Sequence, residues 1–261
     1  MRFLKSMMVA AALVAGAVSA QAAQCGNAAG GFEAWKVAFA PEAKAAGVGP
    51  RGLSALAGTH YATKTIYADR NQHSFHLSLG EFMSKRGSGA IVARGRGLKK
   101  ANAALFASIE ATYGVPAGPI IAIWGMETGF GAVTGNQNTI SAVASLAYDC
   151  RRHDFFTEQA IAALKLVDKG VLSANSVGAM HGEVGQTQFM PKNIFAYGTG
   201  GSLSNKETAL RSTANFLRGH GWKRGAGYQP GQPNFSAIQG WNAASVYQQA
   251  LAIMGKQIDG N

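Results

Sequence analysis

Apolar residues recur along most of this 261-residue chain at the three- and four-residue spacing that amphipathic helices show. In one such segment, Leu105, Ile109 and Tyr113 fall on the same helical face, and Gly114 follows directly. A glycine just past the last apolar position is typical of a helix C-terminus. Helices are predicted on this basis over residues 32–47, 98–114, 115–129, 139–149, 154–170, 204–221 and 241–255. The pattern therefore predicts a mainly α fold.

Several predicted helix ends carry residues that suit a cap. Thr139, Asp154 and Ser204 are predicted N-caps, because short polar side chains accept hydrogen bonds from free backbone N–H groups. Ser204 also has Glu207 three residues later, which is the spacing of a capping box. Gly129 suits a left-handed cap at the end of the third predicted helix. Helix boundaries are thus predicted together with the helices.

Two segments, residues 60–97 and 222–240, are rich in glycine and less regular, and we expect loops or short strands there. No internal repeat and no low-complexity linker interrupts the chain. The simplest organisation is a leader, residues 1–22, followed by one compact domain, residues 23–261.

The leader has the composition of an export signal. Arg2 and Lys5 form a short basic start, and the apolar stretch at residues 7–18 is too short to span a bilayer. Small residues follow and allow cleavage after Ala20 or Ala22. We therefore expect a periplasmic protein that keeps no transmembrane anchor after cleavage. An N-terminal core helix is the alternative, but the stretch has no amphipathic period.

Two cysteines, Cys25 and Cys150, remain after the leader. In an oxidising compartment an even number of cysteines favours a disulfide, here one that ties the mature N-terminus to the main body. Two unpaired thiols are the alternative. No metal site is expected, because His73 and His76, the only histidines at useful spacing, have no acidic or thiol partner nearby.

The charge of the chain is strongly basic. It holds 24 Lys and Arg against 13 Asp and Glu, for a formal net charge of +11. In an exported protein this suits an anionic polymer such as cell-wall glycan, or anionic lipid head groups. Nucleic acid is not the expected partner, because the basic residues are scattered and cluster only at residues 92–100. A solvated helix face explains that cluster equally well.

Glu127 ends the apolar run IAIWGME and precedes a glycine-rich turn. In the last turn of a helix, the negative end of the helix dipole raises the pKa of a carboxyl group. The apolar neighbours Trp124, Met126 and Phe130 raise this pKa further through desolvation. A carboxylic acid that stays protonated near neutral pH can act as a general acid. An ordinary acid exposed at a helix end remains the alternative.

The segment GEVGQTQFMPKNIFAYG, residues 182–198, is the second stretch that suits chemistry. Gly182 and Gly185 allow the backbone to approach a ligand closely or to adopt unusual dihedrals. Gln186 and Gln188 add neutral amides that suit sugar hydroxyls and amides. A tight turn between helices, with incidental glutamines, is the alternative.

The motifs YGVPAGPIIAIWGMETGFG and GQTQFMP together resemble those of the lytic murein transglycosylase B family, whose members are soluble and lipid-anchored cell-wall enzymes. Other blocks agree in order, namely ISAVASLAYDCRRHDFF, TANFLRGHGW and IQGWNAASVYQQALA. The matching blocks run over essentially the whole mature chain. The resemblance implies a lysozyme-like helical core, with further helices and loop or short-strand elements around a glycan groove.

The resemblance also implies a reaction. The family cleaves the β-1,4 bond between N-acetylmuramic acid and N-acetylglucosamine in peptidoglycan. It does so without water, forms a 1,6-anhydromuramoyl end, and relies on a single acid/base, which is Glu127 here. The partner would be peptidoglycan glycan strands, and we expect a monomer with no cofactor.

Further site residues follow by position in the matching motifs. Gln188, with Gln186 beside it, would bond the substrate near its acetamido or hydroxyl groups. Arg151 and Arg152 match an arginine pair that would hold a peptide carboxylate or a lactyl group. Asn242 matches a late asparagine of the groove. The alternatives are a solvated position for the arginines and a helix cap for Asn242.

Three departures from the family pattern limit these assignments. Ala179 stands where some relatives have a serine, which removes one hydroxyl contact. Phe82 stands where a groove tyrosine is expected, which keeps the ring and loses the hydroxyl. Residues 196–207 contain no aspartate, so no calcium site is expected where some relatives insert a calcium-binding loop.

Glu183 is a second carboxylate expected near the groove. With a water molecule between it and Glu127, the site would hydrolyse the glycan as a muramidase does. The interpretation that we favour is a residue that orients backbone and leaves Glu127 as the sole acid/base. A protein of a different class, which binds cell-wall glycan without cleaving it, is a third reading.

Overall fold

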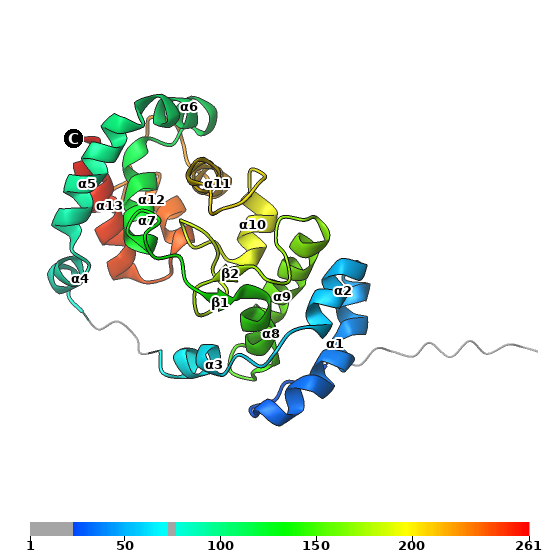
Figure 1. Ribbon diagram of the computed structural model, residues 1–261. Helices are drawn as coiled ribbons and strands as arrows, with labels where there is room; N and C mark the ends of the chain where they lie inside the picture. Colours follow the sequence, from blue (N-terminus) through cyan, green and yellow to red (C-terminus); the bar gives the residue numbers. More distant parts are fainter. Residues whose placement is uncertain (1–22, 73–76, 261) are drawn as a thin grey trace, which may run out of the picture.

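The computed structural model describes residues 23–72 and 77–260. The predicted leader, residues 1–22, lies outside the described residues, and so do His73 and His76. In the described part the chain is mainly helical, with one small two-stranded sheet (Figure 1). The prediction of a mainly α fold is confirmed.

The elements follow one another with short connections. The first are η1 (Ala29–Gly31), α1 (Phe32–Ala45), α2 (Pro50–Ala57), α3 (Thr63–Arg70), α4 (Leu79–Lys85), α5 (Ser88–Ala101), α6 (Ala103–Tyr113), α7 (Ala117–Thr128) and β1 (Gln137–Asn138). The remaining ones are α8 (Thr139–Tyr148), α9 (His153–Asp168), β2 (Val177–Gly178), α10 (Pro191–Tyr197), α11 (Lys206–Gly219), α12 (Phe235–Trp241) and α13 (Ser245–Asp259).

Helix α7 is a core helix. Every residue of it except Glu127 is buried, and a helix that is apolar all round belongs in a protein interior. It packs mainly against α13 and α5. At Gly118 an added Cβ would lie 2.2 Å from the carbonyl oxygen of Gly255 on α13, so only glycine allows the two backbones to approach this closely. This packing fixes the position of the last turn of α7, which carries Glu127.

Helices α8 and α9 form a second packed pair, and α1 and α2 lie beside them (Figure 1). Cys25 and Cys150 form a disulfide with a Cα–Cα distance of 5.0 Å. The bond joins the start of the described chain to the residue two positions after α8. The predicted disulfide is confirmed, and the alternative of two free thiols is excluded.

The sheet lies between these two groups of helices in Figure 1. Its strands are antiparallel, with Gln137 opposite Gly178 and Asn138 opposite Val177. β1 follows the turn after α7, and β2 opens the segment that contains Glu183. The pairing therefore brings the glutamine-rich segment next to the end of α7.

The prediction of loops or short strands over residues 60–97 is wrong, because α3, α4 and most of α5 occupy this range. Helix α4 begins with a capping box, in which Ser78 and Glu81 bond each other's backbone N–H groups. In α5 one of the glycines, Gly95, serves packing. An added Cβ at Gly95 would lie 2.9 Å from Ile121 of α7, so a small residue is needed at this crossing. The 222–240 segment is irregular as far as Asn234, after which α12 begins.

Helix ends agree with the predictions to within a few residues in most cases. Gly129 is left-handed, at φ +58°, as predicted for the end of α7. The N-caps of α8 and α11 are Asn138 and Asn205, each one residue from the predicted Thr139 and Ser204. Both asparagine side chains accept a backbone N–H bond three residues later. Which of two adjacent short polar residues caps a helix depends on backbone geometry, so the sequence does not decide it.

Two other predicted helices differ from the structure. Asp154 lies in the first turn of α9, whose N-cap is Arg152 without a side-chain bond. The predicted 98–114 helix is divided at Asn102 into the end of α5 and α6. Within the described residues, no single helix has both the length and the apolar character of a membrane span. In that part of the chain, only α6 and α7 taken together have this length and apolar character, and a bend of 112° separates the two helices.

Candidate active site

Glu127 lies in the last turn of α7 and is half-buried, the one residue of that helix that is not buried. The chain reverses directly after it. Gly129 and Phe130 are both left-handed, with φ +58° and +66°. The N–H of Phe130 bonds the carbonyl of Trp124, which is the six-residue closure of a Schellman motif. The sequence thus places one carboxyl group at a sharply defined helix end.

Two donors from the C-terminal part of the chain meet on Glu127. Trp241 Nε1 donates to Oε1 at 3.1 Å, and the hydroxyl of Tyr247 donates to the same oxygen. Both rings are held by other aromatic residues. Phe189 packs edge-on against Trp241 with 5.3 Å between ring centroids, and Phe82 lies 6.3 Å from Tyr247. The orientation of the carboxyl group is therefore fixed by groups that themselves have little freedom.

The pKa of Glu127 is raised, mainly because burial removes solvent from the carboxylate. The hydrogen bonds from Tyr247 and Trp241 oppose this effect, as does the more distant charge of Arg86. The negative charge of Glu183 adds to it. The hydroxyl of Tyr247 keeps its proton, because burial and the neighbouring Glu127 raise its own pKa well above the usual value. Glu127 has the properties that a general acid requires.

A small pocket of about 200 Å³ opens at Glu127. Four of the residues singled out in the sequence meet there, namely Glu127, Glu183, Gln188 and Asn242. The other lining residues are Phe189, Met190, Asn193 and Trp241. The pocket combines two carboxyl groups, three amide side chains and an indole ring, which suits a sugar with amide substituents.

Gln188 is held in a strained backbone conformation beside this pocket. Its φ of +54° is unusual for a residue other than glycine. The side-chain Nε2 donates to the carbonyls of Gly185 at 2.8 Å and Thr134 at 3.3 Å. Its Oε1 has no hydrogen-bond partner among the described residues, so this oxygen is available to an N–H or O–H donor of a ligand.

Glu183 is held by a neighbour that sequence reasoning missed. Its Oε2 accepts the backbone N–H of His181 at 3.0 Å, and its Oε1 lies 3.4 Å from His181 Nδ1. Burial by itself raises the pKa of Glu183, but the bonds from His181 outweigh burial and leave that pKa below its usual value. The pocket therefore contains two carboxyl groups whose pKa values are shifted in opposite directions, that of Glu127 upward and that of Glu183 downward.

The arginine pair is placed elsewhere. Arg151 and Arg152 both form ion pairs with the buried Asp69, Arg151 through Nε at 3.0 Å. Neither lines the pocket at Glu127. Gln186 is likewise outside it, because its side chain accepts from Trp124 Nε1 at 2.9 Å and donates to Ser204 O at 2.7 Å. These three side chains are bonded to other parts of the protein. Their contact with a substrate stays a prediction.

Two further residues of the sequence prediction lie at or beside the pocket residues. Asn242 follows α12, and its Oδ1 accepts the N–H of Ala244 at 2.9 Å, so it shapes the turn before α13 while lining the pocket. Ala179 is half-buried and donates its backbone N–H to Glu183 O at 2.8 Å. Position 179 thus lies beside Glu183, and its side chain here is a methyl group without a hydroxyl.

Among residues 23–72 and 77–260, no group of three or more His, Cys, Asp or Glu is arranged to hold a metal ion. In the 196–207 segment, Gly200 and Gly201 are left-handed, and no acidic side chain precedes Glu207. The described residues therefore suggest no ligand set for a cation.

The helical fold of this chain matches the lysozyme-like fold of solved lytic transglycosylases. The crystal structure of SltB3 from Pseudomonas aeruginosa in complex with NAG-NAM-pentapeptide matches this chain with a TM-score of 0.80 and 26% identity, over 88% of this chain and 80% of that one. The soluble lytic transglycosylase SltB1 of the same organism matches in fold, with a TM-score of 0.76 and 22% identity, over 86% and 98% of the two chains.

The chain belongs to the transglycosylase SLT domain family, which matches residues 31–232. It is also 32% identical to the membrane-bound lytic murein transglycosylase B of Escherichia coli over 137 residues. That match spans 47% of this chain and 38% of the E. coli protein, so well under two thirds of the relative's length is covered. The resemblance stated from the motifs is confirmed at the level of the family.

Proposed function

We propose that this protein is a peptidoglycan lytic transglycosylase, which cleaves the β-1,4 bond between N-acetylmuramic acid and N-acetylglucosamine and leaves 1,6-anhydromuramoyl ends. One observation carries the proposal: both hydrogen bonds to Glu127 end on Oε1. No described residue donates to Oε2. The proton of the neutral acid therefore belongs on Oε2, where it is available to a glycosidic oxygen.

The first step is proton donation. Glu127 Oε2 gives its proton to the glycosidic oxygen as the bond to the muramoyl C1 breaks, and the N-acetylglucosamine hydroxyl leaves. Positive charge develops at C1, and the acetamido group of the substrate itself stabilises it, so no second carboxylate has to form a covalent bond. Once Glu127 is ionised, Tyr247 and Trp241 stabilise it through their bonds to Oε1.

The second step reverses the direction of proton transfer. The C6 hydroxyl of the muramoyl residue attacks C1, and Glu127 takes its proton as base. One carboxyl group thus acts as acid and then as base, and the water-free product retains all atoms of the substrate. The complex of SltB3 with NAG-anhNAM-pentapeptide, from a relative 26% identical in sequence, supports this product.

The other pocket residues position the substrate. Gln188 Oε1 would accept the N–H of the acetamido group, and Asn242 lines the same pocket. The negative charge of Glu183 favours the positive charge that develops on the muramoyl ring. Export to the periplasm belongs to the same proposal, since peptidoglycan lies outside the inner membrane. Action as a monomer is proposed with it.

Hydrolysis is the second candidate, because Glu183 lines the same pocket as Glu127 and its lowered pKa keeps it ionised. A water molecule activated by Glu183 would attack C1 and give a reducing end in place of an anhydro end. Against hydrolysis, both Glu183 oxygens already contact His181. This arrangement favours a carboxylate that stays in place as a negative charge, not one that takes a proton from water.

The decisive experiment is product analysis. Purified sacculi are digested with the wild-type protein and with Glu127→Gln, and the soluble fragments are analysed by mass spectrometry. We expect anhydromuramoyl ends from the wild type and no fragments from the variant. Fragments with only reducing ends would establish hydrolysis instead. A wild-type protein that binds sacculi and releases nothing would establish a glycan-binding protein.

A further inference from the structure

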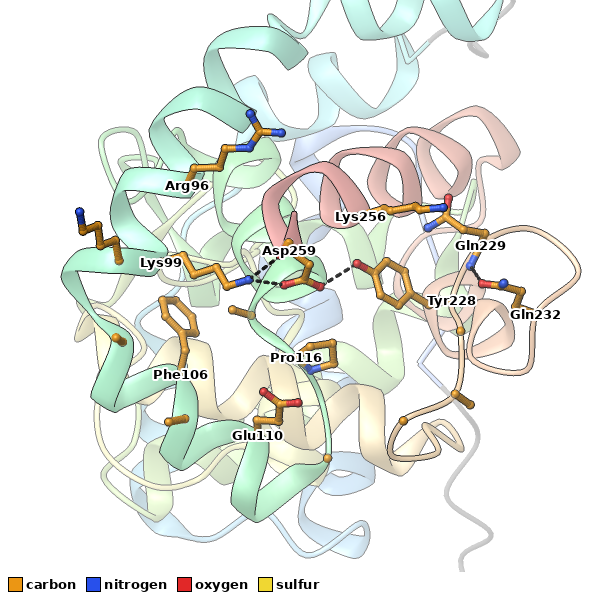
Figure 2. Close-up of a pocket in the computed structure, with 18 residues that line it drawn as sticks. Arg96, Lys99, Phe106, Glu110, Pro116, Tyr228, Gln229, Gln232, Lys256 and Asp259 are labelled. Carbon is orange, nitrogen blue, oxygen red and sulfur yellow. Dashed lines mark hydrogen bonds and ion pairs between the residues drawn. The ribbon is translucent and has the colours of Figure 1, made fainter. Parts of the chain in front are cut away.

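A cavity larger than the one at Glu127 lies elsewhere in the described part of the chain. It measures about 790 Å³ and lies between α5, α6, the start of α7, the loop after Gly225 and the end of α13 (Figure 2). We call it the α5–α13 cavity. Its charged and aromatic lining includes Arg96, Lys99, Phe106, Tyr228, Lys256 and Asp259. A volume of this size is typical of small-molecule and peptide sites.

The α5–α13 cavity lies at the opposite end of two helices from the candidate active site. Ala117 lines it at the start of α7, whereas Glu127 ends that helix, so the two are about 15 Å apart along its axis. Asp259 and Lys256 line it at the end of α13, while Tyr247 near the start of that helix bonds Glu127. The two sites share supporting helices and no lining residue.

The inner wall of the cavity is pre-formed around Asp259. Its Oδ1 accepts from Lys99 Nζ at 3.1 Å and from the N–H of Gly118 at 2.8 Å, at the start of α7. Its Oδ2 accepts the hydroxyl of Tyr228 at 2.8 Å. Burial and the nearby Asp259 raise the pKa of Tyr228, which therefore stays a donor. The carboxylate of Asp259 is fully engaged inside the protein.

The charges that remain for a ligand are mostly positive. Arg96, Lys100 and Lys256 are exposed lining residues, and among the described acids that line the cavity only Glu110 opposes them. Figure 2 shows Arg96 and Lys256 on opposite sides of Asp259. Arg96 uses Nε on the carbonyl of Gln257, which fixes its guanidinium at the rim. An anionic ligand with more than one charge matches this arrangement.

The rest of the lining suits a peptide. Phe106 and Pro116 supply apolar surface, and Gln229 and Gln232 supply amide groups. Gln229 Nε2 donates to Ala252 O, and Gln232 Oε1 accepts the N–H of Gln229, which leaves Gln229 Oε1 and Gln232 Nε2 without partners among the described residues. Gln229 Oε1 can accept a hydrogen bond from a peptide N–H, and Gln232 Nε2 can donate one to a peptide carbonyl.

We propose that the α5–α13 cavity binds a carboxylate-bearing peptide stem of peptidoglycan, on a muramoyl residue other than the one being cleaved. The choice of ligand rests on the proposed function, because the substrate polymer presents such stems in many copies. A stem held here keeps the protein on the polymer while the glycan is cut about 15 Å away. The gain is one of effective concentration and adds no group to the chemistry at Glu127.

The test uses the tripeptide L-Ala-γ-D-Glu-meso-diaminopimelate as a probe. It is titrated into the ¹⁵N-labelled full-length mature protein, and amide shifts are followed. We expect shifts at Gly227, Tyr228 and neighbouring residues, and none around Glu127. The variant Lys100→Glu/Lys256→Glu reverses two exposed cations of the cavity. The control Lys44→Glu/Lys64→Glu reverses two exposed cations on α1 and α3.

The cavity variant should weaken tripeptide binding at least tenfold and reduce retention on intact sacculi, while the control should change neither. Cleavage of soluble glycan strands stripped of their peptides should stay at the wild-type rate in both. Equal binding to both variants, or shifts around Glu127 only, would overturn the proposal. So would a wild type that ignores the tripeptide and binds phosphatidylglycerol vesicles through the same lysines, which would make the cavity a membrane contact. If the proposed function were wrong, the wild type would release no fragments from sacculi, and this result is independent of tripeptide binding.

A different observation carries a second inference, which also rests on the proposed function. The imidazole of His181 lies between two carboxylates, with Nδ1 3.4 Å from Glu183 Oε1 and Nε2 3.9 Å from Asp69 Oδ1. Asp69 is buried and is held in turn by Arg151 and Arg152. His181 Nε2 is buried and has no hydrogen-bond partner among the described residues. We infer that His181 is a positioning residue, which holds the Glu183 carboxylate toward the pocket at Glu127.

The groups that face Glu127 come from several elements: Tyr247 from α13, Trp241 from α12, Arg86 after α4, and Glu183. Replacing His181 with leucine removes the donor beside Glu183, whereas His181→Asn keeps a donor near the position of Nδ1. Without His181 the pKa of Glu183 rises, so its charge raises the pKa of Glu127 less. We therefore expect His181→Leu to lower kcat about tenfold and to move the alkaline limb of the pH–rate profile to lower pH.

His181→Asn should restore most of kcat and the wild-type profile. A residue that only supports the fold predicts a lower Tm for His181→Leu with an unchanged pH profile, and that outcome would refute the positioning role. Loss of all activity at every pH in both variants, with native circular dichroism, would refute it too, because it would place His181 in the chemistry itself. A wild type without activity on sacculi would instead contradict the proposed function.

Discussion

Tyr247 donates its hydroxyl hydrogen bond to Oε1 of Glu127, although the two residues are 120 positions apart in the chain. The contact is possible because α7 and α13 pack closely along their length, with glycines where the backbones meet. One oxygen of the candidate acid is thus committed to two donors, and the other has no donor among the described residues. The different hydrogen bonding of the two oxygens follows from the packing of α7 on α13.

Removal of the Tyr247 hydroxyl should change the pH dependence of the reaction. The bond from Tyr247 lowers the pKa of Glu127, so that pKa should rise further in Tyr247→Phe. The alkaline limb of the pH–rate profile should therefore move to higher pH, with a loss of about 1 kcal/mol in the free energy of unfolding. Tyr67→Phe, on an exposed ring of α3, is the matched control and should behave as the wild type. An unmoved alkaline limb in Tyr247→Phe would show that the hydroxyl does not act on the acid.

Glu127→Gln should abolish cleavage of sacculi while preserving the fold. The amide oxygen can still accept from Trp241 and Tyr247, so the local structure needs no rearrangement. General acid catalysis contributes roughly a hundred- to ten-thousandfold, and here the same residue also serves as base, so the loss should lie at the upper end or beyond. Release of soluble fragments is the measurement. Glu183→Gln is the comparison, and it should keep a reduced activity, about tenfold below the wild type as in His181→Leu, since Glu183 supplies charge and no proton in this mechanism.

The stability of the protein should depend on pH through Glu127. Burial raises the pKa of Glu127 above its value in the unfolded chain, so between these two pKa values the folded state holds a proton that the unfolded state has lost. The free energy of unfolding therefore falls as pH rises through this window. Glu127→Gln removes the effect, and its Tm should exceed that of the wild type by more at pH 8 than at pH 4.

Glu183 has a lowered pKa and contributes in the opposite direction, losing stability as pH falls through its folded pKa. The difference between wild type and Glu127→Gln at each pH cancels this contribution. A Tm difference that is constant across the range would mean that Glu127 has an ordinary pKa in the folded state. Activity should fall at the upper end of this window, around the folded pKa, because there the folded protein loses the proton on Glu127.

The candidate acid could be predicted from the sequence because its causes are local. The apolar run before Glu127 and the glycines after it describe a buried helix end, and both are visible within ten residues. Its partners could not be predicted in the same way. Trp241 and Tyr247 lie 114 and 120 residues away, and only the packing of α7 on α13 brings them to the acid. The sequence motif contained both residues, but a motif does not say which way a ring points.

The same distinction explains the helices that were missed. Residues 60–97 contain many glycines, and glycine usually lowers helix propensity. In α5 the glycine at 95 instead allows close contact with Ile121 and Ile258, a gain that depends on residues 26 and 163 positions away. A local signal did exist in α4, where Ser78 and Glu81 have the spacing of a capping box.

Gly95 and Gly97 offer a matched test of that explanation, because they lie in one helix in different surroundings. An added Cβ at Gly95 would lie 2.9 Å from both Ile121 and Ile258, whereas at Gly97 nothing lies within 4 Å. Gly97→Ala should stabilise the protein by about 0.5–1 kcal/mol through helix propensity. Gly95→Ala should destabilise it by about 1 kcal/mol, because overpacking exceeds that gain. Urea denaturation measures both, and two changes of the same sign would contradict the packing role of Gly95.

Loss of the disulfide should lower stability far more than activity. Cys25 and Cys150 close a loop of 125 residues, for which chain entropy alone predicts a contribution of about 4–5 kcal/mol. Neither cysteine lines the pocket at Glu127 or contacts its donors, so cleavage at 25 °C should continue in Cys25→Ser/Cys150→Ser as long as the protein stays folded. The single variants control for the serine substitutions, and the wild type with reductant should match the double variant in Tm. An unchanged Tm would mean that the unfolded chain is already restrained without the bond, whereas inactivity of a fully folded double variant would mean that the N-terminal segment helps to shape the pocket.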